Sequence, residues 1–297
     1  MSDALFVGLD GGQSGTRVVV GDHGGRVLGR GESGPSNLSD PSGDGLRRAV
    51  DKALAQAVRG LQEPRFAAAF CGMSGGPDDK REILAELIPS ERLYVGTDAE
   101  IALLGGTEGE PGTVVIAGTG SIAFARDASG RTARAGGWGY AFGDEGGAFD
   151  IARRALRASL ASEEGWGPKS ALTESLLSAS GSAAANDLLH RFYREGIPRE
   201  EIAALAPLVD EAASSGDLVA DEILTQAAAE LALIARAARN QFFAADDPSA
   251  VVCSGGVFHS SRLRAAFEER VSPWRLVDPA RPPVEGALLG ACRLVER

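Results

Sequence analysis

The stretch VGLDGGQSGTRVVV, from Val7 to Val20, sets the architecture of the protein. An apolar run ends in Asp10, and a glycine-rich turn separates it from a second apolar run. A P-loop would place lysine and then serine or threonine after its last glycine, whereas Gly15 is followed by Thr16 and Arg17. A dinucleotide-binding fingerprint would open a helix here, but the β-branched residues that follow predict a strand. The stretch therefore predicts a hairpin, either an ordinary one or one whose bare tip lets backbone N–H groups approach an anion.

The second half of the chain repeats this design in TVVIAGTGSIAFARDASGR, which begins at Thr113. Four residue pairs match at a constant offset of 105 residues: Gly15 and Gly120, Asp22 and Asp127, Gly25 and Gly130, Arg26 and Arg131. The second stretch contains a literal G-x-G-x-x-A, but the chain turns again before a helix can form, which argues against a dinucleotide site. Two matching hairpins predict a duplicated domain whose two turns clamp a polyphosphate.

Composition excludes several classes of function. The 297 residues suffice for one large or two medium domains, and the net charge of −11 argues against a nucleic-acid or membrane partner. ATP stays compatible with this charge, because backbone dipoles and Mg²⁺ hold phosphate inside acidic proteins. Three cysteines in apolar runs predict reduced core residues of a cytoplasmic protein, and three histidines without paired spacing do not favour a zinc site. Neither a signal peptide nor a membrane-spanning run is expected.

The first half alternates predicted strands and helices, which implies a mixed sheet with helices on its faces. The expected strands are 5–9, 16–20, 26–31, 66–71 and 93–95, and the expected helices are 45–61 and 79–87. The turn formers of Gly105–Gly112 predict a hinge. In the second half, an apolar stripe from Ile223 to Phe242 predicts a long helix that packs into the core. The strand 250–253 runs into Ser254-Gly255-Gly256 and a helix, a context that suits ligand binding at a helix start.

Two segments carry candidate catalytic and binding residues. Asp98 follows a strand in Gly96-Thr97-Asp98-Ala99-Glu100, where Thr97 and Glu100 form a predicted capping box. The carboxyl end of a strand is also where α/β proteins bind ligands, so Asp98 is a candidate acceptor for a substrate hydroxyl proton, kept ionised by the helix start.

The glycine-rich segment AGGWGYAFGDEGGAFDIARRAL, 135–156, combines bare backbone with Trp138 and Asp144. Asp144 is either an N-cap or a ligand in a sugar pocket, where hydroxyls need polar acceptors and the ring needs an apolar face. Asn37 and Ser74 are further small polar residues at expected strand ends, each of which is also a common turn residue.

Seven motifs in this order, followed by the apolar PPVEGALLGA, resemble the BadF/BadG/BcrA/BcrD ATPase and N-acetylglucosamine kinase branch of the actin/hexokinase/Hsp70 superfamily. These motifs are LDGGQSGTR, SGPSNL, CGMSGG, GTDA, IAGTGS, GGWGYAFGDEGGA and CSGGVF. The resemblance implies an α/β protein with two duplicated ribonuclease-H-like domains and an ATP·Mg²⁺ cleft between them. The implied domains are 1–110 and 111–297, the second with a helical insertion and with a last helix, about 284–297, that packs back on the first domain.

The resemblance also implies roles for single residues. Asp98 matches the family's catalytic base, and Asp10 acts on the metal, mostly through water. The residues implied for the phosphates are Gly12, Gln13 and Thr16 in the first hairpin and Thr119 and Gly120 in the second. The residues implied for adenosine are Ser254, Gly255 and Gly256. The residues implied for the sugar are Asn37, Ser74, Asp98, Gly137, Trp138 and Asp144.

We therefore expect an ATP-dependent amino-sugar kinase that forms N-acetylglucosamine 6-phosphate. A broad-specificity hexokinase, a glucosamine kinase and a non-kinase ATPase or sugar-sensing regulator are the alternatives, and the lack of a helix-turn-helix extension before the first strand argues against the regulator. Family members usually have Gly-Gly-Gly-Thr in the first loop, where this chain has the longer Gly-Gly-Gln-Ser-Gly-Thr. Activator ATPases of the same branch hold an iron–sulfur cluster with paired cysteines, and Cys71 and Cys253 lie in expected strands instead. The sequence leaves the oligomeric state open, a homodimer included.

Overall fold

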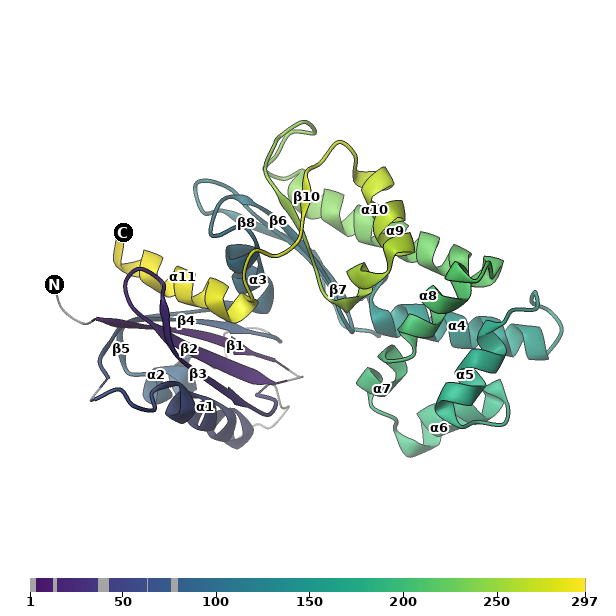
Figure 1. The fold of residues 1–297 in the computed structure, drawn as a ribbon, viewed down its shortest axis with the longest axis horizontal. Coiled ribbons are helices and arrows are strands. Elements are labelled where there is room, and N and C mark those ends of the chain that lie inside the picture. Colours follow the sequence, from purple (N-terminus) through teal and green to yellow (C-terminus); the bar gives the residue numbers. More distant parts are fainter. Residues whose placement is uncertain (1–3, 13–14, 37–42, 63, 76–79, 297) are drawn as a thin grey trace. The chain divides into compact units, whose positions relative to one another are not determined.

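The computed structural model describes residues 4–296 apart from 13–14, 37–42, 63 and 76–79. The chain forms two compact units (Figure 1), of which the first comprises Met1–Gly112 with Asp278–Arg297 and the second Thr113–Val277. Each unit contains one five-stranded sheet. No helix in the described part of the chain is long and apolar enough to cross a membrane.

The sheet of the first unit has the strand order β3-β2-β1-β4-β5. Its strands are β1 (Leu5–Gly11), β2 (Thr16–Gly21), β3 (Val27–Ser33), β4 (Phe66–Met73) and β5 (Ser90–Thr97). β1 pairs antiparallel with β2, as the glycine hairpin predicts, and parallel with β4, which pairs parallel with β5. The carboxyl ends of β1, β4 and β5 therefore meet at one edge of the sheet.

Helices cover both faces of this sheet because successive side chains of a strand point to opposite faces. Val7 and Leu9 pack with α1 (Asp44–Ala57) and α2 (Arg81–Leu87), whereas Phe6 packs with α3 (Asp98–Gly106) and α11 (Pro283–Glu296). α11 ends the chain but belongs to the first unit, where it lies against β1 and β4 (Figure 1). Gly8 permits this contact, since a Cβ atom there would lie 2.5 Å from the backbone nitrogen of Leu288.

The second unit repeats the same topology, with the strand order β10-β9-β6-β7-β8. Its strands are β6 (Gly112–Ala117), β7 (Ser121–Arg126), β8 (Thr132–Gly136), β9 (Val251–Ser254) and β10 (Leu276–Val277). Its helices are α4 (Ala148–Glu163), α5 (Leu172–Ser180), α6 (Ala185–Glu195), α7 (Arg199–Ala203), α8 (Ala206–Ser214), α9 (Leu218–Arg239), the 3₁₀ helix η1 (Gly256–His259) and α10 (Ser261–Val271). Read from β3 and from β8, the two sheets have equivalent orders, which confirms the predicted duplicated α/β fold.

Most of the predicted elements are present, and several differ at their ends, among them the helix predicted for 45–61, which ends at Ala57. In the segment predicted as a hinge, Gly105–Gly112, the structure places Gly105 and Gly106 at the end of α3 and Gly112 at the start of β6. The apolar stripe of α9 is buried as expected, but the helix ends at Arg239, so Phe242 lies beyond it. The glycine turn after β9 leads into η1 before α10 begins. The predicted start of α2, Asp79, lies outside the described residues.

Candidate active site

The first unit brings three polar residues to one edge of its sheet. Asp10 pairs with Gly72 across β1 and β4, and Met73 pairs with Thr97 across β4 and β5. Asp10, Ser74 and Asp98 therefore stand at the carboxyl ends of three neighbouring parallel strands. This edge is where α/β sheets bind their ligands.

Burial and neighbouring charges control the ionisation of Asp10. Burial raises the pKa of Asp10 to about 6, the guanidinium of Arg17 lowers it, and the carboxylate of Asp98 raises it further. Arg17 is its partner across the hairpin, with Nη1 3.7 Å from Oδ2 of Asp10. Because two nearby carboxylates repel each other when both are ionised, a cation at this edge would favour the ionised form of both.

Asp98 begins α3 directly after β5. Its Oδ1 accepts a hydrogen bond of 2.8 Å from the backbone N–H of Ala99, and Thr97 caps the helix by accepting from the N–H of Glu100 at 3.2 Å. One half of the predicted capping box is thus present. Burial raises the pKa of Asp98, while the N–H contact at the helix start lowers it. Desolvation outweighs the N–H contact, and a carboxylate with a raised pKa is a stronger base.

Two buried hydroxyl groups lie beside the first hairpin without a hydrogen-bond partner among the described residues. They belong to Ser36 and Ser74. The N–H of Ser74 donates to the carbonyl of Gly11 at 2.9 Å, and the N–H of Ser36 donates to the carbonyl of Gly12 at 3.1 Å. Since buried polar groups are nearly always satisfied, these hydroxyls are candidate ligand contacts. The sequence singled out Ser74 but missed Ser36, the neighbour of Asn37.

The other predicted residues of the first hairpin have different environments. Gly12 closes the turn by donating its N–H to the carbonyl of Gly15 at 3.0 Å. Thr16 is buried, and its hydroxyl donates to the carbonyl of Gly34 at 2.9 Å, so this proton serves the hairpin itself. Gln13 and Asn37 lie outside the described residues.

The tip of the second hairpin is docked on the start of α4. The N–H groups of Ala148 and Phe149 donate to the carbonyls of Gly118 and Thr119 at 2.8 and 3.1 Å. Gly147 is the N-cap, and a Cβ atom there would lie 2.8 Å from the Thr119 oxygen. The hairpin tip and the helix start therefore form one rigid unit, in which these two N–H groups are already satisfied by the hairpin.

Asp144 lies against this second hairpin and is not the N-cap of α4. It is buried and adopts a left-handed conformation with φ of 63°, which is uncommon for a residue with a side chain. Its Oδ2 occupies the space next to Gly120, where a Cβ atom would lie only 2.4 Å away. Arg199 contributes a counter-charge, with Nη1 3.5 Å from Oδ2. Asp144 thus presents a fixed carboxylate beside the hairpin tip.

The aromatic residue predicted for the sugar lies on the surface of the same loop. Trp138 is 66% exposed, and the guanidinium of Arg134 lies 4.7 Å above its ring. Gly137 donates its N–H to the carbonyl of Ser121 at 2.9 Å, which fixes the loop to the second hairpin. Gly137 and Asp144 are therefore both anchored next to the hairpin, while the Trp138 ring is free to stack on a ligand.

A pocket of about 540 Å³ opens beside the second hairpin. It is lined by Gly118, Thr119, Ala148, Ile151, Glu200, Ala203, Ala204, Ala206, Pro207, Asp210, Leu224, Gly256, Val257, His259 and Ser260. Of the three residues implied for adenosine, only Gly256 lines it. Gly255 has φ of 101° and packs so closely that a Cβ atom would lie 2.4 Å from the Ala117 oxygen, so it shapes the turn. The lining residues of α7 and α8 were missed because no motif marks them.

Comparison with known proteins identifies the family of this chain. A model of the BadF/BadG/BcrA/BcrD ATPase family matches residues 7–291. The chain belongs to this family. The resemblance drawn from the seven motifs is confirmed, and it extends over nearly the whole sequence.

Members of known name are similar along most of their length. An N-acetylmuramic acid/N-acetylglucosamine kinase of Clostridium acetobutylicum is 34% identical over 261 residues, which cover 86% of this chain and 85% of the relative. An N-acetyl-D-glucosamine kinase of Dictyostelium discoideum is 32% identical over 77% of each chain. A solved structure from Chromobacterium violaceum, provisionally described as an N-acetylglucosamine kinase, has a TM-score of 0.77 and 32% identity, and covers 96% of this chain and 98% of its own.

The cysteines do not suit the cluster-binding members of this family. Cys71 lies in β4 and Cys253 in β9, and both are buried free thiols. Burial raises the pKa of Cys71 to about 12, which disfavours the thiolate that a metal cluster requires. The chain thus offers no cysteine pair that fits an iron–sulfur cluster among its three cysteines.

Proposed function

We propose that this protein transfers the γ-phosphoryl group of ATP to the 6-hydroxyl of N-acetylglucosamine. The observation that carries the proposal is the pair of partly buried carboxylates, Asp10 and Asp98, at the carboxyl edge of the first sheet. The names of the relatives at 34% and 32% identity support an amino sugar as the acceptor.

Asp98 acts as the general base in this proposal. Its carboxylate accepts the proton of the attacking sugar hydroxyl, and burial suits it to the task by raising its pKa. Proton removal makes the sugar oxygen a better nucleophile as its bond to phosphorus forms, and the bond to the ADP oxygen breaks.

Asp10 holds Mg²⁺, mostly through water. Its carboxylate is a hard oxygen ligand, and Mg²⁺ often takes only one or two protein carboxylates while it keeps its water ligands, so the site fits this ion. When bound, the ion neutralises charge on the phosphate oxygens of ATP. The negative charge of the neighbouring Asp98, which raises the pKa of Asp10, favours binding of a cation here.

The second unit binds ATP in this proposal. The hairpin 118–120 presents its backbone to the phosphates, and the pocket beside Gly256 accepts the adenosine. The sugar contacts proposed in this unit are Asp144 and Trp138. Those proposed in the first unit are Ser74 and Asp98, together with Asn37, which lies outside the described residues.

A sugar panel tests the proposal. Release of ADP is measured with N-acetylglucosamine, N-acetylmuramic acid, glucosamine and glucose, each with Mg²⁺ and with EDTA, and products are identified by mass spectrometry. We expect magnesium-dependent ADP release with N-acetylglucosamine and one sugar phosphate for each ADP. N-acetylmuramic acid is the second acceptor of interest, because the Clostridium relative is named for both sugars. Hydrolysis at the same rate without any sugar would indicate an ATPase, and sugar binding without a phosphorylated product would indicate a sensor.

We also expect the protein to act in the cytoplasm, where ATP is available. A homodimer is a further expectation, which light scattering in solution checks directly.

A further inference from the structure

We propose that Asp150, Arg154 and Glu230 form a positioning network that holds Asp144 in the conformation that receives the sugar. The inference rests on the proposed function, in which Asp144 is a sugar ligand, and it adds three residues that neither the motifs nor the pocket mark. None of the three touches ATP or sugar in this proposal. They act through the loop that carries Asp144.

The loop that follows Asp144 is bent into an uncommon backbone conformation. Asp144 has φ of 63° and Gly146 has φ of 77°. The loop is also tightly enclosed: the Asp144 carboxylate presses against Gly120 on one side, and a Cβ atom at Gly146 would lie 2.7 Å from the carbonyl oxygen of Ala227 in α9 on the other. A residue with a side chain in the left-handed region persists only where its surroundings hold it there.

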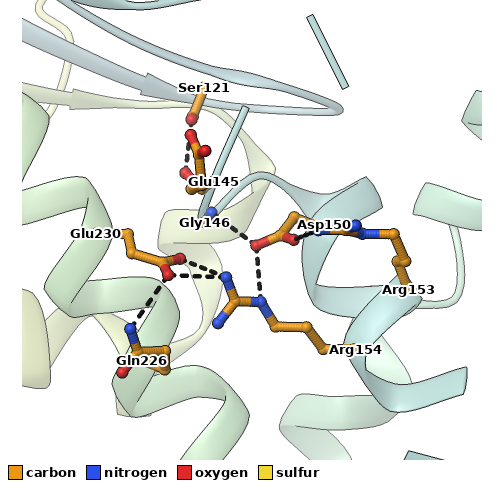
Figure 2. Close-up of polar contacts among 8 residues, drawn as sticks. All are labelled: Ser121, Glu145, Gly146, Asp150, Arg153, Arg154, Gln226 and Glu230. Atoms are coloured by element: carbon orange, nitrogen blue, oxygen red, sulfur yellow. Dashed lines mark hydrogen bonds and ion pairs between the residues drawn. The ribbon is translucent and has the colours of Figure 1, made fainter. Parts of the chain in front are cut away.

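The network provides such a restraint (Figure 2). Asp150, in the first turn of α4, accepts a hydrogen bond of 3.1 Å from the N–H of Gly146 through Oδ2. The same oxygen accepts a hydrogen bond of 2.9 Å from Nε of Arg154. Arg154 then reaches α9, where its Nη2 lies 2.8 and 2.7 Å from the two carboxylate oxygens of Glu230. The loop, α4 and α9 are thereby joined by one chain of charged hydrogen bonds.

The charges of this network alternate, and the network is buried at Asp150 and partly exposed at Arg154 and Glu230. The Asp150 side chain is buried, and Arg153 adds a second contact of 2.6 Å to its Oδ1. Burial lowers the pKa of Arg154, but the hydrogen bonds and charges of Glu230 and Asp150 raise it overall. Gln226, one turn before Glu230, donates to the Glu230 carboxylate at 3.1 Å and orients it. Charge-assisted hydrogen bonds in such an environment are stronger and more directional than neutral ones.

The extent of the network distinguishes it from an ordinary helix cap. A carboxylate in the first turn of α4 would suffice to satisfy nearby N–H groups, with no need of a partner 76 residues away on α9. From the opposite side, the hydroxyl of Ser121 in the second hairpin donates to the carbonyl of Glu145 at 2.6 Å (Figure 2). The backbone on both sides of Glu145 is therefore fixed, one side by the hairpin and the other by α9 through Arg154. This arrangement sets the position of Asp144 relative to Gly120.

Loss of the network should weaken sugar binding and spare ATP binding. In Arg154→Met, Asp150 retains Arg153 and Glu230 retains Gln226, so no buried carboxylate is left alone, but the link to α9 is broken. We expect the dissociation constant of N-acetylglucosamine to rise by about 10- to 100-fold, the scale expected when a ligand group is displaced by about 1 Å. The dissociation constant of ATP should change by less than about threefold. Glu230→Gln should also raise the dissociation constant of N-acetylglucosamine, and both variants should melt cooperatively.

The matched control is Arg262→Met. Arg262 also binds a carboxylate of α9, with Nη2 2.9 Å from Oδ2 of Asp221, but this exposed pair does not reach the loop. Its loss should leave sugar affinity unchanged. A similar loss of sugar affinity in the control would show that α9 is merely sensitive to the removal of an ion pair, and would overturn the inference.

A double-mutant cycle with Asp144→Asn tests whether the network acts through Asp144. If it does, Arg154→Met lowers sugar affinity in the wild-type background and has little further effect in Asp144→Asn, because the effects of substitutions at coupled residues do not add. Equal effects in both backgrounds, or unchanged sugar affinity in Arg154→Met, would overturn the inference. Hydrogen exchange of the amides in 144–147 gives a readout without sugar: exchange should be faster in Arg154→Met than in Arg262→Met. If the wild-type protein binds no sugar, the proposed function fails, and this exchange result alone still decides whether the network holds the loop.

Discussion

Replacement of Asp10 by asparagine should stabilise the protein while it abolishes catalysis. The side chain of Asp10 is largely shielded from water, and its pKa rises from 3.8 to about 6, mainly through loss of hydration. The folded protein therefore opposes ionisation of this group, and above the folded pKa the ionised carboxylate costs stability. Asparagine has nearly the same size and carries no charge, so Asp10→Asn removes this cost together with the proposed metal ligand.

The magnitude follows from the difference between the two pKa values. About 2 pKa units correspond to about 3 kcal/mol, since each unit is about 1.4 kcal/mol. The contact with Arg17, 3.7 Å away, lowers the pKa of Asp10 and is already included in this difference, so we expect a net stabilisation of up to about 3 kcal/mol at pH 8. A domain of this size should then melt roughly 2–4 °C higher for each kcal/mol gained.

The stabilisation by Asp10→Asn should increase with pH. Below about pH 4 the carboxyl group is protonated in both the folded and the unfolded chain, so the variant gains nothing. The stability lost by ionising Asp10 in the folded protein appears as the pH rises from about 4 to 6 and reaches its full size above about pH 7. Thermal melts with EDTA at pH 4.5 and pH 8 should therefore show a gain at pH 4.5 that is less than half of the gain at pH 8.

The control is Asp127→Asn. Asp127 lies in the turn between β7 and β8, where hydrogen bonds from Ser129 and Arg131 lower its pKa to about 2 despite some desolvation. Its replacement should not stabilise the protein at pH 8. If Asp10→Asn melts at or below the wild-type temperature at pH 8, burial does not dominate at Asp10 and the reasoning is refuted.

Three further predictions concern packing, the nucleotide pocket and the metal. Gly8→Ala should lower the free energy of unfolding, measured in urea, by about 3 kcal/mol, because its Cβ atom would lie 2.5 Å from the Leu288 nitrogen and separate α11 from β1. The control Gly34→Ala should cost far less, because no atom lies within 4 Å of its Cβ position. Gly256→Phe should raise the KM for ATP by about 10-fold or more, because Gly256 lines the pocket. It should not lower stability, because no atom lies within 4 Å of the Cβ position. An unchanged KM would contradict ATP binding in this pocket. Removal of Mg²⁺ by EDTA should abolish turnover, and full activity in EDTA would exclude the role given to Asp10.

The sequence predicts those parts of the fold that depend on local patterns. Glycine turns between β-branched runs give both hairpins, and their constant offset of 105 residues predicts the repeated topology that the two sheets share. The Thr97 cap of α3 is equally local, since donor and acceptor are three residues apart. The sequence identifies Asp98 as a candidate base for the same reason, because Asp98 directly follows Thr97.

Features that depend on packing between distant segments could not be predicted. The helix α11 packs on β1 more than 270 residues earlier in the chain, and Arg154 meets Glu230 across 76 residues. The pocket takes its lining from α7 and α8, which are defined by their neighbours and carry no motif. The raised pKa of Asp98 also depends on burial, which the local capping pattern does not reveal.

Transfer of labelled phosphate from γ-³²P-ATP to N-acetylglucosamine, by wild type and by Asp98→Asn side by side, tests the central claim most directly. We predict that the wild-type protein forms labelled N-acetylglucosamine 6-phosphate, and that Asp98→Asn forms it about 10²- to 10⁴-fold more slowly, as loss of a general base requires. Both proteins should still bind the sugar and ATP in calorimetry. Label found only in inorganic phosphate, or more than about a tenth of wild-type turnover in Asp98→Asn, would contradict the account.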